Sequence, residues 1–306
     1  MGKKFSKVTT SHWGAFNVFV KNGRIIKTEP FQADPAPPKI SELVPNAVYH
    51  ATRIDKPYVR KGWIEKNSNT VRGSDEFIPL GWEDATDLAA KELIRVKNDY
   101  GNKSIYGGSY GWASAGRFHH SQSQLHRFLN SFGGYVSSFA SYSTGAAQAI
   151  IPHVLGLNFH KITWGEINSW SLIEKHTDNL IIFGGINPKN SQVSMGGSTE
   201  HDVSKHFKKF GKMGKNMVSI SPQKDDSPKE TRWLPIKPGT DVALMLAIAY
   251  VLETEKLSDQ NFLTKYCTGY DLFKNYFLGK NGHLAKTPEW ASKITGINAS
   301  DITNLA

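Results

Sequence analysis

The chain has 306 residues, of which 39% are hydrophobic and 21% are charged. This balance is typical of a folded globular protein and excludes a disordered chain, and the length suits about two ordinary domains. The single cysteine, Cys267, excludes an intrachain disulfide, a four-cysteine zinc site and a cysteine-bound iron–sulfur cluster. The formal charge of +10 favours an anionic ligand, nucleic acid or a membrane surface as a partner.

The first 60 or so residues are predicted to be rich in β structure. Phe16, Val18 and Val20 recur at every second position ahead of Asn22-Gly23, a pair typical of a type I′ hairpin turn. The proline-rich stretch at 34–38 predicts a rigid, extended connector. No apolar stretch follows the basic residues at the N-terminus, which predicts a cytoplasmic protein. A periplasmic location is the alternative if a leader preceded this numbering.

From Trp82 onward the pattern becomes α/β. Apolar residues at helical spacing over 85–96, followed by Gly101, predict a helix with a glycine cap. Residues 104–106 are expected to form a short strand that enters the glycine-rich turn at 107–112. Helices are predicted from His120 to Phe132 and from just after Ser143 toward Gly156. The longest apolar run, 242–252, is too short for the roughly 20 residues of a membrane span and is interpreted as a buried helix.

The third section of the chain has the pattern of a βαβ unit. Apolar strands are predicted at 180–183 and 217–220, with an amphipathic helix between them over 203–210. Thr240 is the expected N-cap of the apolar helix that follows. The predicted fold class is therefore α/β: a small β-rich domain at 1–60, an α/β domain at 61–165, and a Rossmann-like nucleotide-binding domain at 166–306.

Glycines that follow a predicted strand are candidates for a ligand site. In open α/β sheets ligands bind beyond the carboxyl ends of the strands, where glycine allows a close approach to phosphates. Gly184, Gly185 and Asn187 follow the strand at 180–183 and fit this use. An ordinary turn is the simpler interpretation, because the GxGxxG pattern of nicotinamide-dependent enzymes is missing here.

Ser143 has three possible roles. An N-cap at the start of the next helix is the simplest, and the hydroxyl oxygen could alternatively bind a hard, high-valent metal. A nucleophile elbow is disfavoured because Ser141, not glycine, stands two residues earlier. The histidines show no metal-binding spacing and are interpreted as surface or interior residues. A solvated helix face is the first explanation of the lysines between 205 and 215, and a surface that attracts anions is the second.

Three segments in register resemble the molybdopterin oxidoreductases of the DMSO, TMAO and biotin sulfoxide reductase group. They are residues 108–112 (Gly-Ser-Tyr-Gly-Trp), 142–148 (Tyr-Ser-Thr-Gly-Ala-Ala-Gln) and 240–246 (Thr-Asp-Val-Ala-Leu-Met-Leu). Residues 11–14 (Ser-His-Trp-Gly) and 288–291 (Pro-Glu-Trp-Ala) are similar to the same group. The resemblance runs from about residue 10 to the end of the sequence.

This resemblance implies a cofactor and a set of site residues. Enzymes of the group bind one molybdenum between two molybdopterin guanine dinucleotides, without an iron–sulfur cluster in this branch, and Ser143 matches the protein ligand of the metal. Tyr110 and Trp112 match residues placed over the metal and, with Ser143, are the expected catalytic residues; Trp112 is also an expected cofactor contact. The positions that match the segments lining one nucleotide tail are Gly185, Asn187, Asn190, Ile220, Ser221, Pro222, Pro238, Gly239 and Asp241.

The activity implied is reduction of a small S- or N-oxide by oxygen-atom transfer, with electrons from a donor of unknown identity. The missing leader favours similarity to biotin and methionine sulfoxide reductases, with TMAO or DMSO reductase as the alternative. Members of the group are longer, so we expect the C-terminal domain to be incomplete and the 306 residues alone to be an inactive portion. The segment at 221–224 (Ser-Pro-Gln-Lys) also departs from the acidic or Asn residue, and the Arg, that relatives often have.

Two further classes compete with this interpretation. A Rossmann-type nicotinamide enzyme would need the missing GxGxxG turn. A basic nucleic-acid-binding module would need clustered Lys and Arg among stacking aromatic residues, whereas the basic residues here are dispersed. We therefore expect neither nucleic acid nor a membrane span among the partners.

Overall fold

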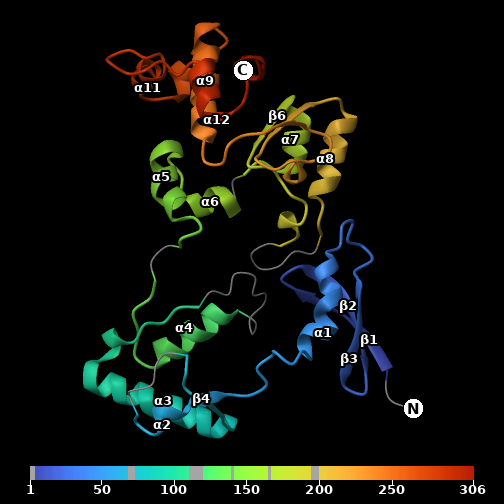
Figure 1. Cartoon of the computed structure of the whole chain (residues 1–306), viewed down its shortest axis with the longest axis vertical. Coiled ribbons are helices and arrows are strands. Elements are labelled where there is room, and N and C mark those ends of the chain that lie inside the picture. The colour runs from blue at the N-terminus through green and yellow to red at the C-terminus, as the bar shows by residue number, and fades with distance from the viewer. Residues whose placement is uncertain (1–3, 68–72, 110–119, 139–140, 165–166, 194–199) are drawn as a thin grey trace. The chain divides into compact units, whose positions relative to one another are not determined.

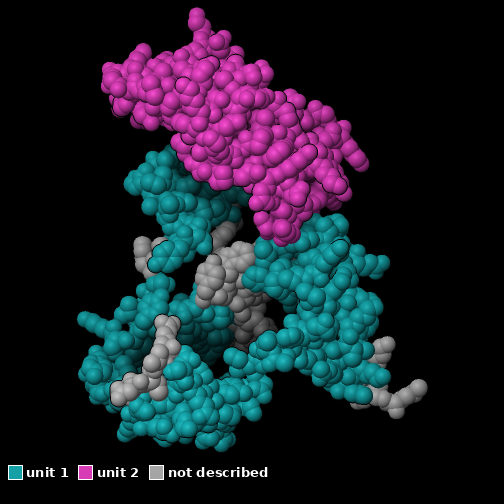
Figure 2. All heavy atoms as spheres, viewed as in Figure 1, with its two compact units in different colours: residues 1–167, 192–201 teal, residues 168–191, 202–306 magenta. Residues whose placement is uncertain are grey.

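The computed structural model describes residues 4–67, 73–109, 120–138, 141–164, 167–193 and 200–306. Residues 1–167 together with 192–201 form one compact unit, and residues 168–191 together with 202–306 form the other (Figure 2). The connection between residues 184 and 202 therefore belongs partly to each unit. The three domain boundaries given above stay a prediction.

The first unit begins with a three-stranded antiparallel sheet in the order β1-β2-β3 (Figure 1). Its strands are β1 (Lys4–Ser11), β2 (Gly14–Lys21) and β3 (Arg24–Pro30). Asn22 and Gly23 join β2 to β3 with φ angles of 52° and 75°. A type I′ turn requires positive φ at both central residues, so the predicted hairpin is confirmed.

Residues 31–57 contain no strand, whereas the sequence analysis predicted a β-rich region up to about residue 60. After β3 the chain forms the 3-10 helix η1 (Lys39–Leu43) and the short helix α1 (Val44–Val48), with Pro45 in its first turn. Proline is favoured in the first turn because an N–H there would have no acceptor within the helix, so its absence costs no hydrogen bond. The hydroxyl of Thr28 donates to the Ser41 carbonyl at 2.7 Å and holds η1 against β3. The β-rich region thus ends near residue 30.

Short elements and two longer helices complete the middle of the first unit. Strands β4 (Tyr58–Arg60) and β5 (Phe77–Pro79) pair around α2 (Lys61–Ile64). Helix α3 (Trp82–Tyr100) ends at Gly101 with φ of 75°, as predicted, and α4 (Ser121–Ser131) begins after His120. The strand expected at 104–106 is reduced to one parallel bridge between Tyr106 and Val136, because the 3-10 turn η2 (Asn102–Ser104) occupies its start. Helices α5 (Gly145–Leu155) and α6 (Phe159–Trp164) follow.

The second unit is built on the parallel sheet β6-β7-β8 (Figure 1). Its strands are β6 (Asn179–Phe183), β7 (Asn216–Ile220) and β8 (Arg232–Leu234). Helices α7 (Trp170–His176) and α8 (Val203–Lys212) bury Ile182 and Met217 on one face. Helices α9 (Asp241–Thr254), α12 (Pro288–Thr295) and α13 (Ala299–Leu305) bury Ile220 and Leu234 on the other. The predicted βαβ unit β6-α8-β7 is confirmed.

Two details of α9 differ from the sequence analysis. Only one side of the helix, which includes Leu244, is buried, whereas Val242 is 66% exposed. Thr240 does hold the N-cap position, but its hydroxyl donates to the Lys237 carbonyl at 2.7 Å and does not cap the helix. The short helices α10 (Gln260–Tyr266) and α11 (Tyr270–Phe277) follow α9. Within the described part of the chain, no helix has the length and apolar character to cross a membrane.

Candidate cofactor site

The glycine pair after β6 forms the first part of the candidate site. Gly184 and Gly185 have φ angles of 87° and 74°, a region that residues with a Cβ rarely adopt. The Gly184 N–H donates to the Ile220 carbonyl at 2.8 Å, so the turn starts as an extension of the sheet. Beyond it, Asn187 opens a turn in which the Asn190 N–H donates to the Asn187 carbonyl at 2.9 Å. Asn190 itself begins the 3-10 turn η3 (Asn190–Gln192).

The segment after β7 forms the second part. Ile220 and Ser221 are fully buried, which fixes where the strand ends. The Ser221 hydroxyl accepts the Gln223 N–H at 3.3 Å, and its carbonyl accepts the indole N–H of Trp233 at 2.9 Å. Pro222 is exposed at the turn. The hydroxyl and the carbonyl of Ser221 therefore stabilise this turn by hydrogen bonds to other residues of the protein.

The residues after β8 lead into α9. Pro238 and Gly239 are exposed, and Gly239 has a φ of 77°. Asp241 is the first residue of α9, which is long enough to present a helix dipole. Because β6, β7 and β8 are parallel, the three segments that follow them leave from the same edge of the sheet, the edge where α/β proteins bind ligands.

One residue that the sequence analysis passed over joins two of these segments. Asp226 lies in the 3-10 turn η4 (Lys224–Asp226) after β7, and its carboxylate accepts the side-chain N–H of Asn187 at 2.9 Å. The sequence contains no spacing signal for this contact, because the two residues are far apart along the chain.

Ser143 lies in a solvent-exposed turn ahead of α5. The N-cap of α5 is Thr144 and not Ser143, so the simplest interpretation of Ser143 is wrong. The Thr144 hydroxyl accepts the side-chain amide of Gln148 at 2.7 Å and lies 3.2 Å from the Ser141 hydroxyl. These neighbours shape the turn by short local contacts. The hydroxyl oxygen of a serine is a hard donor, which suits a high-valent metal.

Two other predicted catalytic residues, Tyr110 and Trp112, lie outside the described residues. Just before them, the side-chain amide of Gln122 donates to the Ser109 carbonyl at 2.7 Å. This bond ties the described end of the glycine-rich turn to the first turn of α4.

His201 and His206 make hydrogen bonds inside the protein, whereas His50, His153, His176 and His283 are exposed, so the described histidines include both surface and interior residues. Buried His201 places Nδ1 2.6 Å from the Asp34 carboxylate and Nε2 2.9 Å from the Gln192 carbonyl. His206 places Nδ1 2.6 Å from the Glu174 carboxylate. Hydrogen bonds from Lys209 and then from His206 lower the pKa of Glu174. In the described part of the chain, no three His, Cys, Asp or Glu side chains are grouped as a metal site would require.

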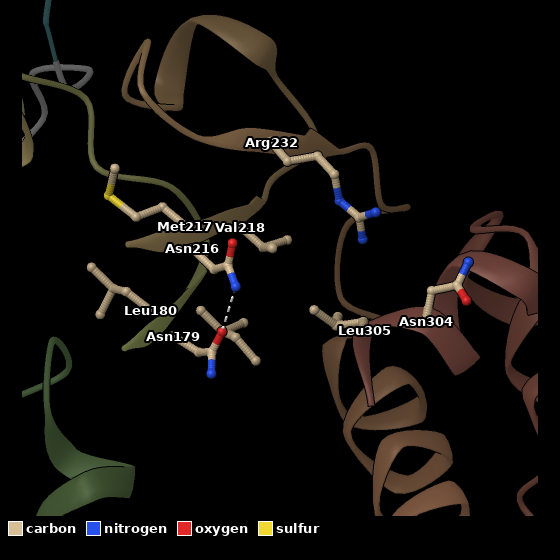
Figure 3. Close-up of a pocket in the computed structure, with 9 residues that line it drawn as sticks. Asn179, Leu180, Asn216, Met217, Val218, Arg232, Asn304 and Leu305 are labelled. Atoms are coloured by element: carbon tan, nitrogen blue, oxygen red, sulfur yellow. Dashed lines mark hydrogen bonds between the residues drawn. The ribbon is translucent and has the colours of Figure 1, made fainter. Parts of the chain in front are cut away.

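A cavity of about 320 Å³ lies at the other end of the sheet (Figure 3). Arg232, at the start of β8, and Asn179 and Asn216, at the starts of β6 and β7, line it together with Leu305. The Asn216 side-chain amide donates to that of Asn179 at 3.0 Å (Figure 3). None of the residues predicted to bind the cofactor lines this cavity, so it is separate from the candidate site.

Mixed α/β architecture with glycine turns at the carboxyl ends of parallel strands defines the class of protein, and comparison with known sequences defines the family. The family profile described as "Molybdopterin oxidoreductase" matches residues 53–285, and the profile of its N-terminal domain matches residues 9–49. The chain belongs to the molybdopterin oxidoreductase family.

Three relatives show which members of the family the chain is similar to. It is 38% identical to trimethylamine-N-oxide reductase of Haemophilus influenzae over 304 residues, which cover 98% of this chain and 36% of that protein. It is 37% identical to dimethyl sulfoxide/trimethylamine N-oxide reductase of Cereibacter sphaeroides, with 96% and 36% covered. Biotin sulfoxide reductase of the same organism is 37% identical, with 91% and 38% covered. The chain thus spans little more than a third of the length of these relatives.

Proposed function

We propose that this protein takes part in the molybdenum-dependent reduction of a small S- or N-oxide by oxygen-atom transfer. The match of the family profile to residues 53–285 carries the proposal, and the names of the relatives, which are reductases of N-oxides and sulfoxides, support it. A sulfoxide such as that of biotin or methionine is the first candidate substrate, with trimethylamine N-oxide and dimethyl sulfoxide as the alternatives. A cytoplasmic location stays a prediction.

The segments after the strands of the second unit fit the guanine dinucleotide tail of a molybdopterin. A Cβ added to Gly185 would lie 2.6 Å from the Asp226 carbonyl oxygen, so glycine is needed for the chain to pass there. Positive-φ glycines and the start of α9 are the features with which α/β layers approach phosphates. In this proposal the second unit is a Rossmann-like layer in which Gly185, Asn190, Gly239 and Asp241 line the tail, while Ile220 and Ser221 hold the turn.

Ser143 fits the role of the protein ligand of the metal. Ser143 is an exposed residue of a turn that hydrogen bonds among Ser141, Thr144 and Gln148 shape, and the N-cap position of α5 belongs to Thr144. When bound, the molybdenum cofactor supplies the two-electron exchange with the substrate oxygen, and the protein supplies binding, orientation and the exclusion of water.

Tyr110 is the residue proposed to act on the substrate oxygen. The resemblance implies a position near the metal, where the Tyr110 phenol would donate a hydrogen bond to the oxygen that leaves the substrate, with Trp112 as cover. The variant Tyr110→Phe keeps the ring and removes only the donor. In the full-length protein we expect this variant to reduce every S- and N-oxide more slowly, with an unchanged melting temperature; unchanged turnover would leave Tyr110 a packing role only.

The experiment that tests the proposed function measures metal, nucleotide and turnover together. The protein is purified from a host that makes the cofactor, and its molybdenum content and acid-released guanine nucleotide are determined. Reduction of several S- and N-oxides is then assayed with an artificial electron donor. The proposal expects molybdenum and guanine nucleotide to copurify with the protein; protein that contains neither would contradict it.

A further inference from the structure

Asp226 is the point at which the segments after β6 and β7 meet. Its carbonyl oxygen accepts the Ile186 N–H at 2.7 Å, and its carboxylate accepts the side-chain N–H of Asn187 at 2.9 Å. Both donors lie in the turn that follows β6, whereas Asp226 ends the 3-10 turn after β7. One residue therefore binds its neighbour segment through both its backbone and its side chain.

The close approach at Gly185 belongs to the same contact. A Cβ at this position would lie 2.6 Å from the carbonyl oxygen and 2.9 Å from the Cβ of Asp226. Three consecutive residues, 185–187, thus meet Asp226: the first by packing without a side chain, and the next two by hydrogen bonds. The two segments form one coupled structure at the ligand edge of the sheet.

Both polar atoms of the Asn187 side-chain amide make hydrogen bonds within these two segments. Its side-chain oxygen accepts the Lys189 N–H at 3.1 Å while its nitrogen donates to Asp226. An asparagine held in this way fixes the direction of the following residues, because the turn closes on the side chain itself. Asn187 therefore acts through the shape of the turn that carries Asn190.

The negative charge of Asp226 indicates which role it has near the nucleotide tail. A carboxylate at the edge of a site for a diphosphate repels the ligand, so direct contact with the phosphates is not its role. Its hydrogen bond to Asn187 needs an acceptor oxygen and no formal charge. An asparagine at position 226 would retain an acceptor oxygen, which makes it a matched control.

We propose that Asp226 is a positioning residue that holds the turn after β6, through Asn187 and Ile186, in the shape that binds the nucleotide tail. This inference rests on the proposed function, since it concerns the same nucleotide. Loss of the side-chain contact should loosen residues 184–190 and weaken nucleotide binding. A loosened turn loses conformational entropy when the ligand binds, and this loss makes the binding free energy less favourable.

The test compares Asp226→Ala with two controls, Asp226→Asn and Asp225→Ala, in the full chain. Asp225 is the exposed neighbour of Asp226 in the same 3-10 turn. Hydrogen exchange of the amides of residues 184–190 is measured without ligand, and guanosine diphosphate is titrated as the probe. We expect Asp226→Ala to speed exchange roughly fivefold and to weaken binding roughly tenfold, at an unchanged melting temperature. Both controls should stay within about twofold of the wild-type protein.

The outcomes separate this inference from the proposed function. If the wild-type protein and all variants bind guanosine diphosphate equally, the positioning role is overturned and the proposed function stands. If the wild-type protein binds no guanosine diphosphate, the inference and the nucleotide part of the proposed function are both overturned, whatever the exchange shows. Weakened binding in Asp225→Ala equal to that in Asp226→Ala would show that any change in this 3-10 turn weakens binding, and it would also overturn the inference.

Discussion

The segments predicted to hold the nucleotide tail, in the second unit, and the Ser143 turn, in the first unit, are built in different ways. The segments after β6 and β7 are anchored by a buried sheet and by contacts between residues far apart in sequence, such as Asn187 and Asp226. The Ser143 turn is shaped by neighbours within a few residues of it and lies exposed, ahead of a helix, α5, in which no described residue is buried. A nucleotide tail needs a surface of fixed shape, which depends on packing. A single metal ligand needs only one oxygen in a defined turn, and local contacts can define a turn.

The largest effect is expected at the Ser143 turn. In the full-length protein, Ser143→Ala should abolish S- and N-oxide reduction and leave the melting temperature nearly unchanged, because Thr144, not Ser143, occupies the N-cap position. Ser138→Ala, at another exposed serine of the same stretch, is the control and should retain full turnover. Steady-state assays and thermal unfolding check both results. Undiminished reduction in Ser143→Ala would contradict the proposal that Ser143 binds the metal.

In the second unit, substitutions in the core should lower the free energy of unfolding, in contrast to Ser143→Ala, which should affect turnover and not stability. Phe210 is fully buried between α8 and the sheet, so Phe210→Ala should lower the free energy of unfolding by about 3–5 kcal/mol. Phe262 is 53% exposed, and Phe262→Ala should cost roughly 0.5 kcal/mol or less. Denaturant unfolding measures both variants. Equal losses would show that the packing of this unit has been misjudged.

Gly107 tests how the glycine-rich turn near residues 110–112 is supported. A Cβ there would lie 2.1 Å from Leu129 Cδ1 and 2.8 Å from the ring of Tyr135. Gly107→Ala should therefore destabilise the protein by about 1–3 kcal/mol through overpacking. Leu129→Ala makes room, so the double variant should lose less stability than the sum of the two single variants. Strict additivity would contradict the close packing.

The smallest effect concerns pH. Hydrogen bonds from Lys209 and His206 hold the pKa of Glu174 below its ordinary value, so its stabilisation is complete above the unfolded-state pKa of about 4.3. The stabilisation is lost as the pH falls through the lower folded-state pKa. The difference in unfolding midpoint between the wild-type protein and Glu174→Gln should thus shrink from neutral pH toward about pH 3. Glu255→Gln, at an exposed position, should show no such trend; a difference that is constant with pH would refute the role of Glu174.

Much of the architecture could be predicted because it depends on local patterns. The Asn22-Gly23 hairpin, the glycine that ends α3 and the apolar strands of the βαβ unit follow from turn chemistry and from hydrophobic periodicity. The short helices at 39–43 and 44–48, which pack on β3, were not predicted, because helices of five residues are too short to show a hydrophobic period. The apolar sequence of α9 predicts a buried helix but does not show which side is covered, and in the structure Val242 is exposed.

The candidate site was predictable only through resemblance. Residue spacing alone favoured an ordinary turn at Gly184-Gly185 and an N-cap at Ser143, and the structure shows that Thr144 takes the cap position. Asp226 and the buried pair of Asp34 and His201 could not be predicted, because each contact joins segments that only the fold brings together. Contacts of this kind have no period and no local motif.

The most direct test of the central claim is X-ray absorption at the molybdenum edge, applied to the wild-type protein and to Ser143→Ala. Both are purified from the same cofactor-producing host, and both molybdenum contents are measured. If Ser143 binds the metal through its side-chain oxygen, the spectrum of the variant will show a changed ligand environment at the metal. A variant that contains molybdenum and gives the wild-type spectrum would contradict the claim.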